Sequence, residues 1–110
     1  MRATGPSARA ALAALLLCAG CAGGREPRTY AVEIRNFVFT PAALAVAPGD
    51  TVVWTNRDIV PHTATSEAGG WDTGSIAANA TARVVVPEGG LGAYRCAFHP
   101  TMRGALEAEK

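Results

Sequence analysis

Short apolar runs with polar neighbours fill the chain from residue 30 onward, and none of them continues as a helical period. The first run, residues 30–39, is read as one alternating stretch that ends before Pro41, and five shorter runs follow it: "ALAV", "TVVWT", "TARVVV", "AYRC" and "GALEA". The intervening "PGD" and "PEGGLG" are typical of turns, because proline presets φ and glycine accepts positive φ. Many short strands in so small a domain predict an all-β fold, a sandwich or barrel, in a single domain.

A tyrosine near the end of the chain suggests how these strands connect. Tyr94 follows the glycine-rich corner and stands two residues before Cys96. This is the place of the tyrosine corner of Greek-key sandwiches, in which the phenol bonds to the backbone. An immunoglobulin-like domain would share the pattern but needs a second cysteine on the facing sheet. We therefore expect a Greek-key β-sandwich or barrel of another kind.

The N-terminus has the order of an export signal. Arg2 and Arg9 precede an apolar run over residues 10–18, and small residues follow it. The run is too short for a helix that spans a membrane. Residues 1–20 are therefore predicted to be a signal peptide, and the protein is expected in the periplasm or at the cell envelope.

The segment "CAGC" at the end of this signal resembles the lipobox of bacterial lipoproteins. The resemblance implies cleavage before Cys21, a lipid on that cysteine, a small polar tether over residues 21–28 and a folded domain over residues 29–110. A lipid on Cys21 would hold the domain at a membrane surface. Cys18 stands where lipoproteins usually have leucine, so cleavage without lipidation is the alternative.

Charge and cysteine content limit the possible functions of the mature chain. Loss of Arg2 and Arg9 leaves eight Lys and Arg against nine Asp and Glu in about 90 residues, which gives no indication of nucleic-acid binding. If Cys21 carries a lipid, Cys96 has no disulfide partner in an oxidising compartment. A thiol there is protected when it is buried or bound to a metal.

Three potential metal ligands share one short loop. Cys96, His99 and Met102 are separated by two residues each, and the other histidine of the chain, His62, follows the "TVVWT" strand. Two imidazoles, a thiolate and a weak thioether form the ligand set of a blue-copper site, and the same ligands can capture zinc. Each residue also has an ordinary interpretation: a loop histidine, a core methionine or a buried cysteine. A Cys–His nucleophile pair is disfavoured because the chain has no room for a substrate domain, so no enzyme is expected.

Longer stretches resemble the cupredoxins, in particular the amicyanin-like and plastocyanin-like branch. They are "FVFTPAALAVAPGDTVVWTNRDIVPHTATSE", "WDTG" and "GAYRCAFHPTMRGAL". The resemblance implies one type 1 copper per chain, with His62, Cys96 and His99 as strong ligands, both histidines through Nδ1, and Met102 as the long axial ligand. It also implies a carrier of single electrons, with a donor and an acceptor protein binding transiently near His99, the more exposed histidine. We expect a monomer.

Two residues beside the ligands differ from the family pattern. Thr63 replaces the asparagine that commonly follows the first histidine, and its hydroxyl is expected to help tie the two ligand loops together. Phe98 replaces the proline that precedes the loop histidine in amicyanin. Its amide is expected to donate a hydrogen bond to the Cys96 sulfur.

Two other functions remain open. A copper delivery or storage protein would use the same metal, although such proteins tend to expose ligands for exchange, whereas this chain places both histidines in one compact set. A metal-free structural sandwich is the second alternative, and a reactive Cys96 thiol would indicate it.

Overall fold

The computed structural model describes residues 25–110, so the predicted signal segment 1–20 and Cys21 lie outside the described residues. Residues 25–110 form strands and loops, and this part of the chain contains no helix capable of crossing a membrane. The strands are β1 (Thr29–Arg35), β2 (Val38–Thr40), β3 (Ala43–Val46), β4 (Thr51–Asn56), β5 (Thr65–Ser66), β6 (Thr81–Val85), β7 (Gly92–Arg95) and β8 (Arg103–Ala108).

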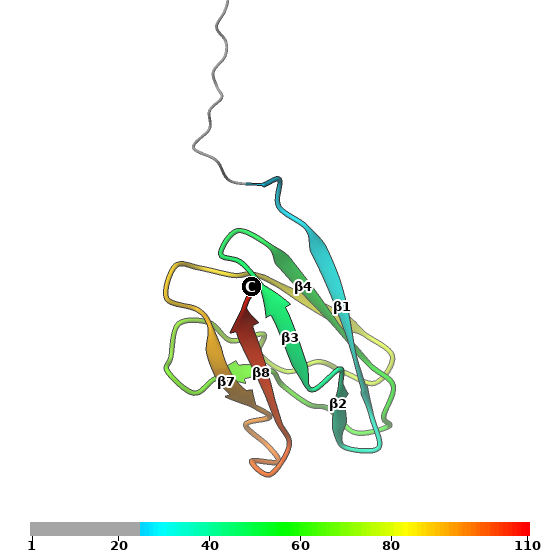
Figure 1. Ribbon diagram of the computed structural model, residues 1–110. Helices are drawn as coiled ribbons and strands as arrows, with labels where there is room; N and C mark the ends of the chain where they lie inside the picture. The colour runs from blue at the N-terminus through cyan, green and yellow to red at the C-terminus, as the bar shows by residue number, and fades with distance from the viewer. Residues whose placement is uncertain (1–24) are drawn as a thin grey trace, which may run out of the picture.

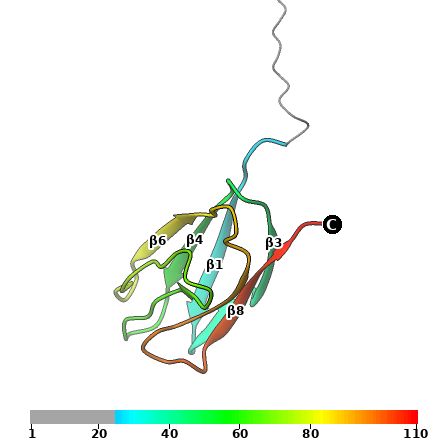
Figure 2. The same cartoon turned by 90° about the vertical axis from the view of Figure 1, so that its left-hand side faces the viewer.

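The strands form two four-stranded sheets, in the orders β2-β1-β4-β6 and β3-β8-β7-β5. Both sheets are mixed, since β1 pairs in parallel with β4 and β3 in parallel with β8, while the other pairs are antiparallel. Figures 1 and 2 show the sheets as the two layers of a sandwich, with the β1–β2 turn and the β7–β8 loop at the same end. The prediction of a single all-β domain is confirmed.

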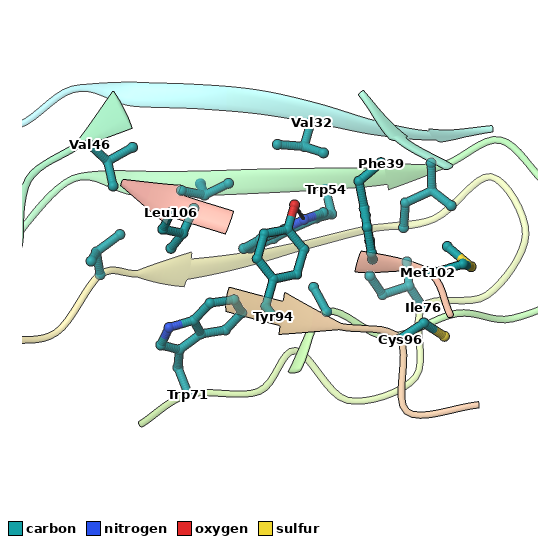
Figure 3. Packing of buried hydrophobic residues seen from close by; sticks show 14 residues of the cluster. Val32, Phe39, Val46, Trp54, Trp71, Ile76, Tyr94, Cys96, Met102 and Leu106 are labelled. Atoms are coloured by element: carbon teal, nitrogen blue, oxygen red, sulfur yellow. Dashed lines mark hydrogen bonds between the residues drawn. The ribbon is translucent and has the colours of Figure 1, made fainter. Parts of the chain in front are cut away.

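The hydrophobic core lies between the two sheets (Figure 3). Trp54 on β4 and Tyr94 on β7 are its largest fully buried side chains, and their rings meet edge to face at 5.6 Å. The Tyr94 hydroxyl accepts a hydrogen bond from the indole N–H of Trp54 at 3.3 Å, in place of the backbone bond expected of a tyrosine corner. Burial raises the pKa of Tyr94 to about 12. The phenol therefore serves as a neutral core group.

The single run predicted over residues 30–39 is wrong, because it is a hairpin of β1 and β2. Asn36 and Phe37 form its two-residue turn, with φ of 55° and 62°, and Arg35 pairs with Val38 across it. Positive φ at both central residues is the requirement of a type I′ turn. The alternation already breaks in the sequence, because the apolar residues Ile34 and Phe37 are three positions apart rather than two. As a consequence the Phe37 side chain is about half exposed rather than part of the core.

Asp50 fixes the N-terminal segment to the domain. Its buried carboxylate accepts hydrogen bonds from the backbone amides of Arg28 and Ala47, at 2.8 and 2.9 Å, and from the Arg25 guanidinium at 2.6 and 2.9 Å. The last part of the predicted tether, residues 25–28, thus lies against the domain. The hydrogen bond from the Arg25 side chain has the largest effect on the pKa of Asp50, and the two backbone amides add to it. Together they hold this pKa well below its usual range, although burial alone would raise it.

We expect Asp50→Asn to destabilise the protein at neutral pH and to have less effect in acid. Because the folded pKa lies below the unfolded one, the carboxylate contributes stability above its ordinary pKa and loses it as pH falls below about 4. The amide can satisfy only one of the two backbone donors, so the free energy of unfolding should fall by about 1–3 kcal/mol at pH 7. Urea unfolding at pH 7 and pH 3 measures both effects. Glu88→Gln, at an exposed carboxylate, is the control, and a loss of equal size at both pH values would contradict the expectation.

Candidate metal centre

Side chains from both sheets converge at the end of the sandwich that carries the β7–β8 loop. His62 follows β4 of the first sheet, Cys96 directly follows β7 of the second sheet, and His99 lies in the loop that leads to β8. One donor atom from each of the three lies within 4.8 Å of the other two. His62 and Cys96 are fully buried and His99 is partly buried. The structure thus brings together three of the four predicted ligands.

The three donor atoms are spaced for a single ion. The Cys96 Sγ lies 3.7 Å from His62 Nδ1 and 3.6 Å from His99 Nδ1. Around one ion with bonds of about 2.3 Å to sulfur and about 2.0–2.1 Å to nitrogen, trigonal or tetrahedral angles separate sulfur from nitrogen by about 3.5–3.8 Å. The observed distances fall in this range, and Nδ1 is the nitrogen that faces the thiol in both histidines. The residues present therefore fit a bound metal.

Backbone hydrogen bonds fold the β7–β8 loop around this point. His99 N donates to Cys96 O at 3.3 Å, Met102 N donates to His99 O at 2.9 Å, and Cys96 N donates to Met102 O at 3.1 Å. These bonds bring residues three positions apart close together. Met102, the predicted axial ligand, is buried, and Figure 3 shows its sulfur and that of Cys96 at the same end of the core. Its role toward a metal stays a prediction.

The loop that carries His62 is held by backbone and side-chain bonds. His62 and Ile76 exchange both backbone hydrogen bonds, at 3.2 and 2.7 Å. The fully buried Asn56 side chain donates to the carbonyls of Val60 and Ile76, at 2.8 and 2.9 Å. These bonds fix the backbone of His62 without using its imidazole.

Asp58 contacts the outer nitrogen of His62 and was missed by the sequence analysis. One carboxylate oxygen lies 2.8 Å from His62 Nε2 and also accepts the amide of Phe37 at 2.9 Å, while the other oxygen accepts the amide of Asn36 at 2.6 Å. Burial alone would raise the pKa of Asp58, but these hydrogen bonds outweigh it and hold the pKa below its ordinary value. The signal in the sequence was an acidic residue four positions before the histidine, in the same loop.

Thr63 ties the two ligand loops together by two contacts. Its hydroxyl oxygen accepts the amide of Ala97 at 2.7 Å, and its own amide donates to Cys96 Sγ at 3.3 Å. The tie expected of this hydroxyl is thus present. The hydrogen bond expected from Phe98 is absent: within residues 25–110 the amide that donates to the Cys96 sulfur is that of Thr63. Phe98 instead occupies the tight turn from Cys96 to His99, with its side chain half exposed.

The Phe37 ring covers both histidines from the outside. Its centroid lies 5.0 Å from that of His62 and 4.9 Å from that of His99, with interplanar angles of 85° and 87°. Such edge-to-face geometry is the favoured arrangement of aromatic pairs. The alternating pattern of residues 30–39 predicts Phe37 in a strand and gives no sign of this contact.

A β-sandwich with a buried cysteine and two histidines at one end has the design of a small metal-binding protein. The chain belongs to the cupredoxin-like domain family, whose model matches residues 8–107.

Solved structures of amicyanin are similar to this chain. A reduced amicyanin with phenylalanine in place of a proline has 29% sequence identity and a TM-score of 0.62, covering 74% of this chain and 82% of that chain. A reduced Cu(I) form at pH 4, with glycine in place of a proline, has 27% identity and a TM-score of 0.64 over the same shares. Among curated protein sequences, none matches this chain. The resemblance to amicyanin-like cupredoxins, first noted in the sequence, is confirmed.

Proposed function

We propose that this protein is a type 1 copper protein that carries single electrons between redox partners. The observation that supports the proposal most directly is the convergence of His62 Nδ1, Cys96 Sγ and His99 Nδ1 at 3.6–3.7 Å from sulfur to nitrogen. Two imidazoles and a thiolate with a weak axial sulfur form the ligand set of blue-copper electron-transfer sites. Met102 is the axial ligand in this proposal. In this proposal the protein acts as an electron carrier and not as an enzyme.

Copper, when bound, would supply a one-electron change between Cu(II) and Cu(I). The residues around the site would limit rearrangement during this change. His62 is held through its backbone to Ile76 and Cys96 through its backbone to Met102, so the positions of these two ligands are fixed by bonds that do not involve their donor atoms. Cys96 and Met102 provide the soft sulfur donors that favour Cu(I), while the imidazoles also suit Cu(II).

His99 is the proposed point of electron exchange. It is the least buried of the three ligands, and the exposed side chains of Ile59 and Phe98 lie in the two loops that carry the histidines. We propose that a donor and an acceptor protein dock transiently on this end. We further propose export to the periplasm or cell envelope, with a lipid on Cys21 and a monomeric domain at the membrane surface.

The absorption spectrum of the purified protein after addition of Cu(II) tests the proposal. We expect an intense visible charge-transfer band that disappears on reduction, because the Cys96 thiolate would bind copper directly. Cys96→Ser should lose the band, whereas Ser75→Ala, at an exposed residue outside the site, should keep it. Copper bound without an intense band would overturn the proposal and favour copper delivery or storage.

A further inference from the structure

We infer that the β1–β2 turn is part of the metal centre, and that Asp58 and Phe37 are positioning residues for its two histidines. The inference rests on the proposed function only in taking His62 and His99 as ligands. The donor atoms that lie together are those of His62, Cys96 and His99, so Asp58 and Phe37 are not proposed as ligands. Both act through the histidine rings.

The Asp58 carboxylate joins the turn to His62. It accepts the amides of Asn36 and Phe37, at 2.6 and 2.9 Å, and lies 2.8 Å from His62 Nε2. Both turn amides and the histidine therefore share one acceptor. The side chain of Asp58 is only 10% exposed, so water competes little for these contacts.

This contact determines which nitrogen of His62 is free. An ionised carboxylate only accepts hydrogen bonds, so at 2.8 Å from Asp58 the imidazole carries its proton on Nε2. In the neutral ring the lone pair then lies on Nδ1, the atom that faces Cys96 Sγ at 3.7 Å. A metal-binding histidine usually gives its other N–H to such a partner, which fixes both the tautomer and the ring orientation. Asp58 thus prepares His62 for metal before any metal is bound.

Phe37 positions the second histidine, His99, through its aromatic ring. Its backbone adopts φ of 62°, which is uncommon for a bulky residue, and its amide is held by Asp58. In this conformation the ring lies edge to face with both histidine rings, at 5.0 and 4.9 Å, although the side chain is 47% exposed. The ring thus restricts the motion of His99, the ligand with the greatest exposure.

The experiment compares Asp58→Asn and Phe37→Leu with the unchanged protein. In the metal-free protein, histidine side-chain nitrogen NMR reports the tautomer of His62. In wild-type Asp58, one carboxylate oxygen accepts the amide of Asn36 and the other accepts the amide of Phe37 and faces His62 Nε2. The side chain of Asp58→Asn has only one oxygen and cannot serve both positions, so we expect loss of the fixed Nε2–H tautomer. Competition with a colorimetric Cu(I) chelator should show an affinity lower by about 10–100-fold. The Phe37→Leu variant should keep the tautomer but bind Cu(I) more weakly.

Val38→Ala is the matched control, because Val38 is also exposed and directly follows the turn, but has no aromatic ring to pack on the histidines. It should leave the tautomer and the Cu(I) affinity unchanged. Urea unfolding of each metal-free variant separates loss of the fold from loss of positioning. If Asp58→Asn keeps the Nε2–H tautomer and both variants bind Cu(I) within twofold of the unchanged protein, the inference is overturned. The tautomer is read without copper, so its result stands whether or not the protein gives a blue spectrum.

Discussion

Gly104→Ala is expected to cost about 3 kcal/mol in the free energy of unfolding, at the upper end of the range for overpacked cores. A Cβ at this position would lie 2.4 Å from the Cζ atom of Tyr94 and 2.6 Å from its hydroxyl oxygen, well inside contact distance. The two residues are direct partners across β7 and β8. The ring has no space to withdraw, since it packs against Phe39 at 4.8 Å and Trp71 at 5.5 Å.

Urea unfolding monitored by tryptophan fluorescence measures this cost, and two comparisons locate its origin. Gly70→Ala adds the same methyl group where no atom lies within 4 Å, and should be nearly neutral. In a Tyr94→Leu background the cost of Gly104→Ala should shrink, because the clashing ring is gone, and a double-mutant cycle gives the coupling. Equal costs with and without the Tyr94 ring would show that the clash is not the cause.

The positions of most strands could be predicted from the sequence because their apolar faces repeat every second residue. Val52 and Trp54 on β4 are both buried, as the alternation requires. The β1–β2 hairpin was marked in the sequence only by the break in alternation between Ile34 and Phe37, since a two-residue turn interrupts an extended run only briefly. The pair Asn36 and Phe37 also lacks the glycine that usually marks such a turn. β5 is only two residues long and carries no pattern at all.

The candidate site was predictable to the extent that its chemistry is local. Cys96, His99 and Met102 lie within one loop, and His62 was the only other histidine of the chain. The contacts that hold these residues are not local. Asp58 reaches the β1–β2 turn, and the position of Phe37 depends on the turn itself. Residues that support a site from another strand pair become visible only when the topology is known.

We expect Thr63→Val to weaken both the fold and metal binding. Valine has the shape of threonine but cannot accept the amide of Ala97, which the Thr63 hydroxyl accepts at 2.7 Å. The side chain is buried, so the amide would lose its partner without gaining water, at a cost of about 1–3 kcal/mol in unfolding free energy. The same bond joins the loop of His62 to that of Cys96. Loss of such a supporting contact typically lowers metal affinity by about 10–100-fold.

Two further substitutions test whether loss of the hydrogen bond from the Ala97 amide accounts for both the lower stability and the weaker metal binding. Thr63→Ser keeps the hydroxyl and should retain most of the stability and Cu(I) affinity. Thr65→Val removes the hydroxyl that lies 2.8 Å from that of Thr63 but leaves the bond to Ala97, so its effect should be smaller. Urea unfolding and Cu(I) competition measure the two quantities separately. If Thr63→Val loses stability but keeps its affinity, the hydroxyl supports the fold alone, because a tie between ligand loops must affect both.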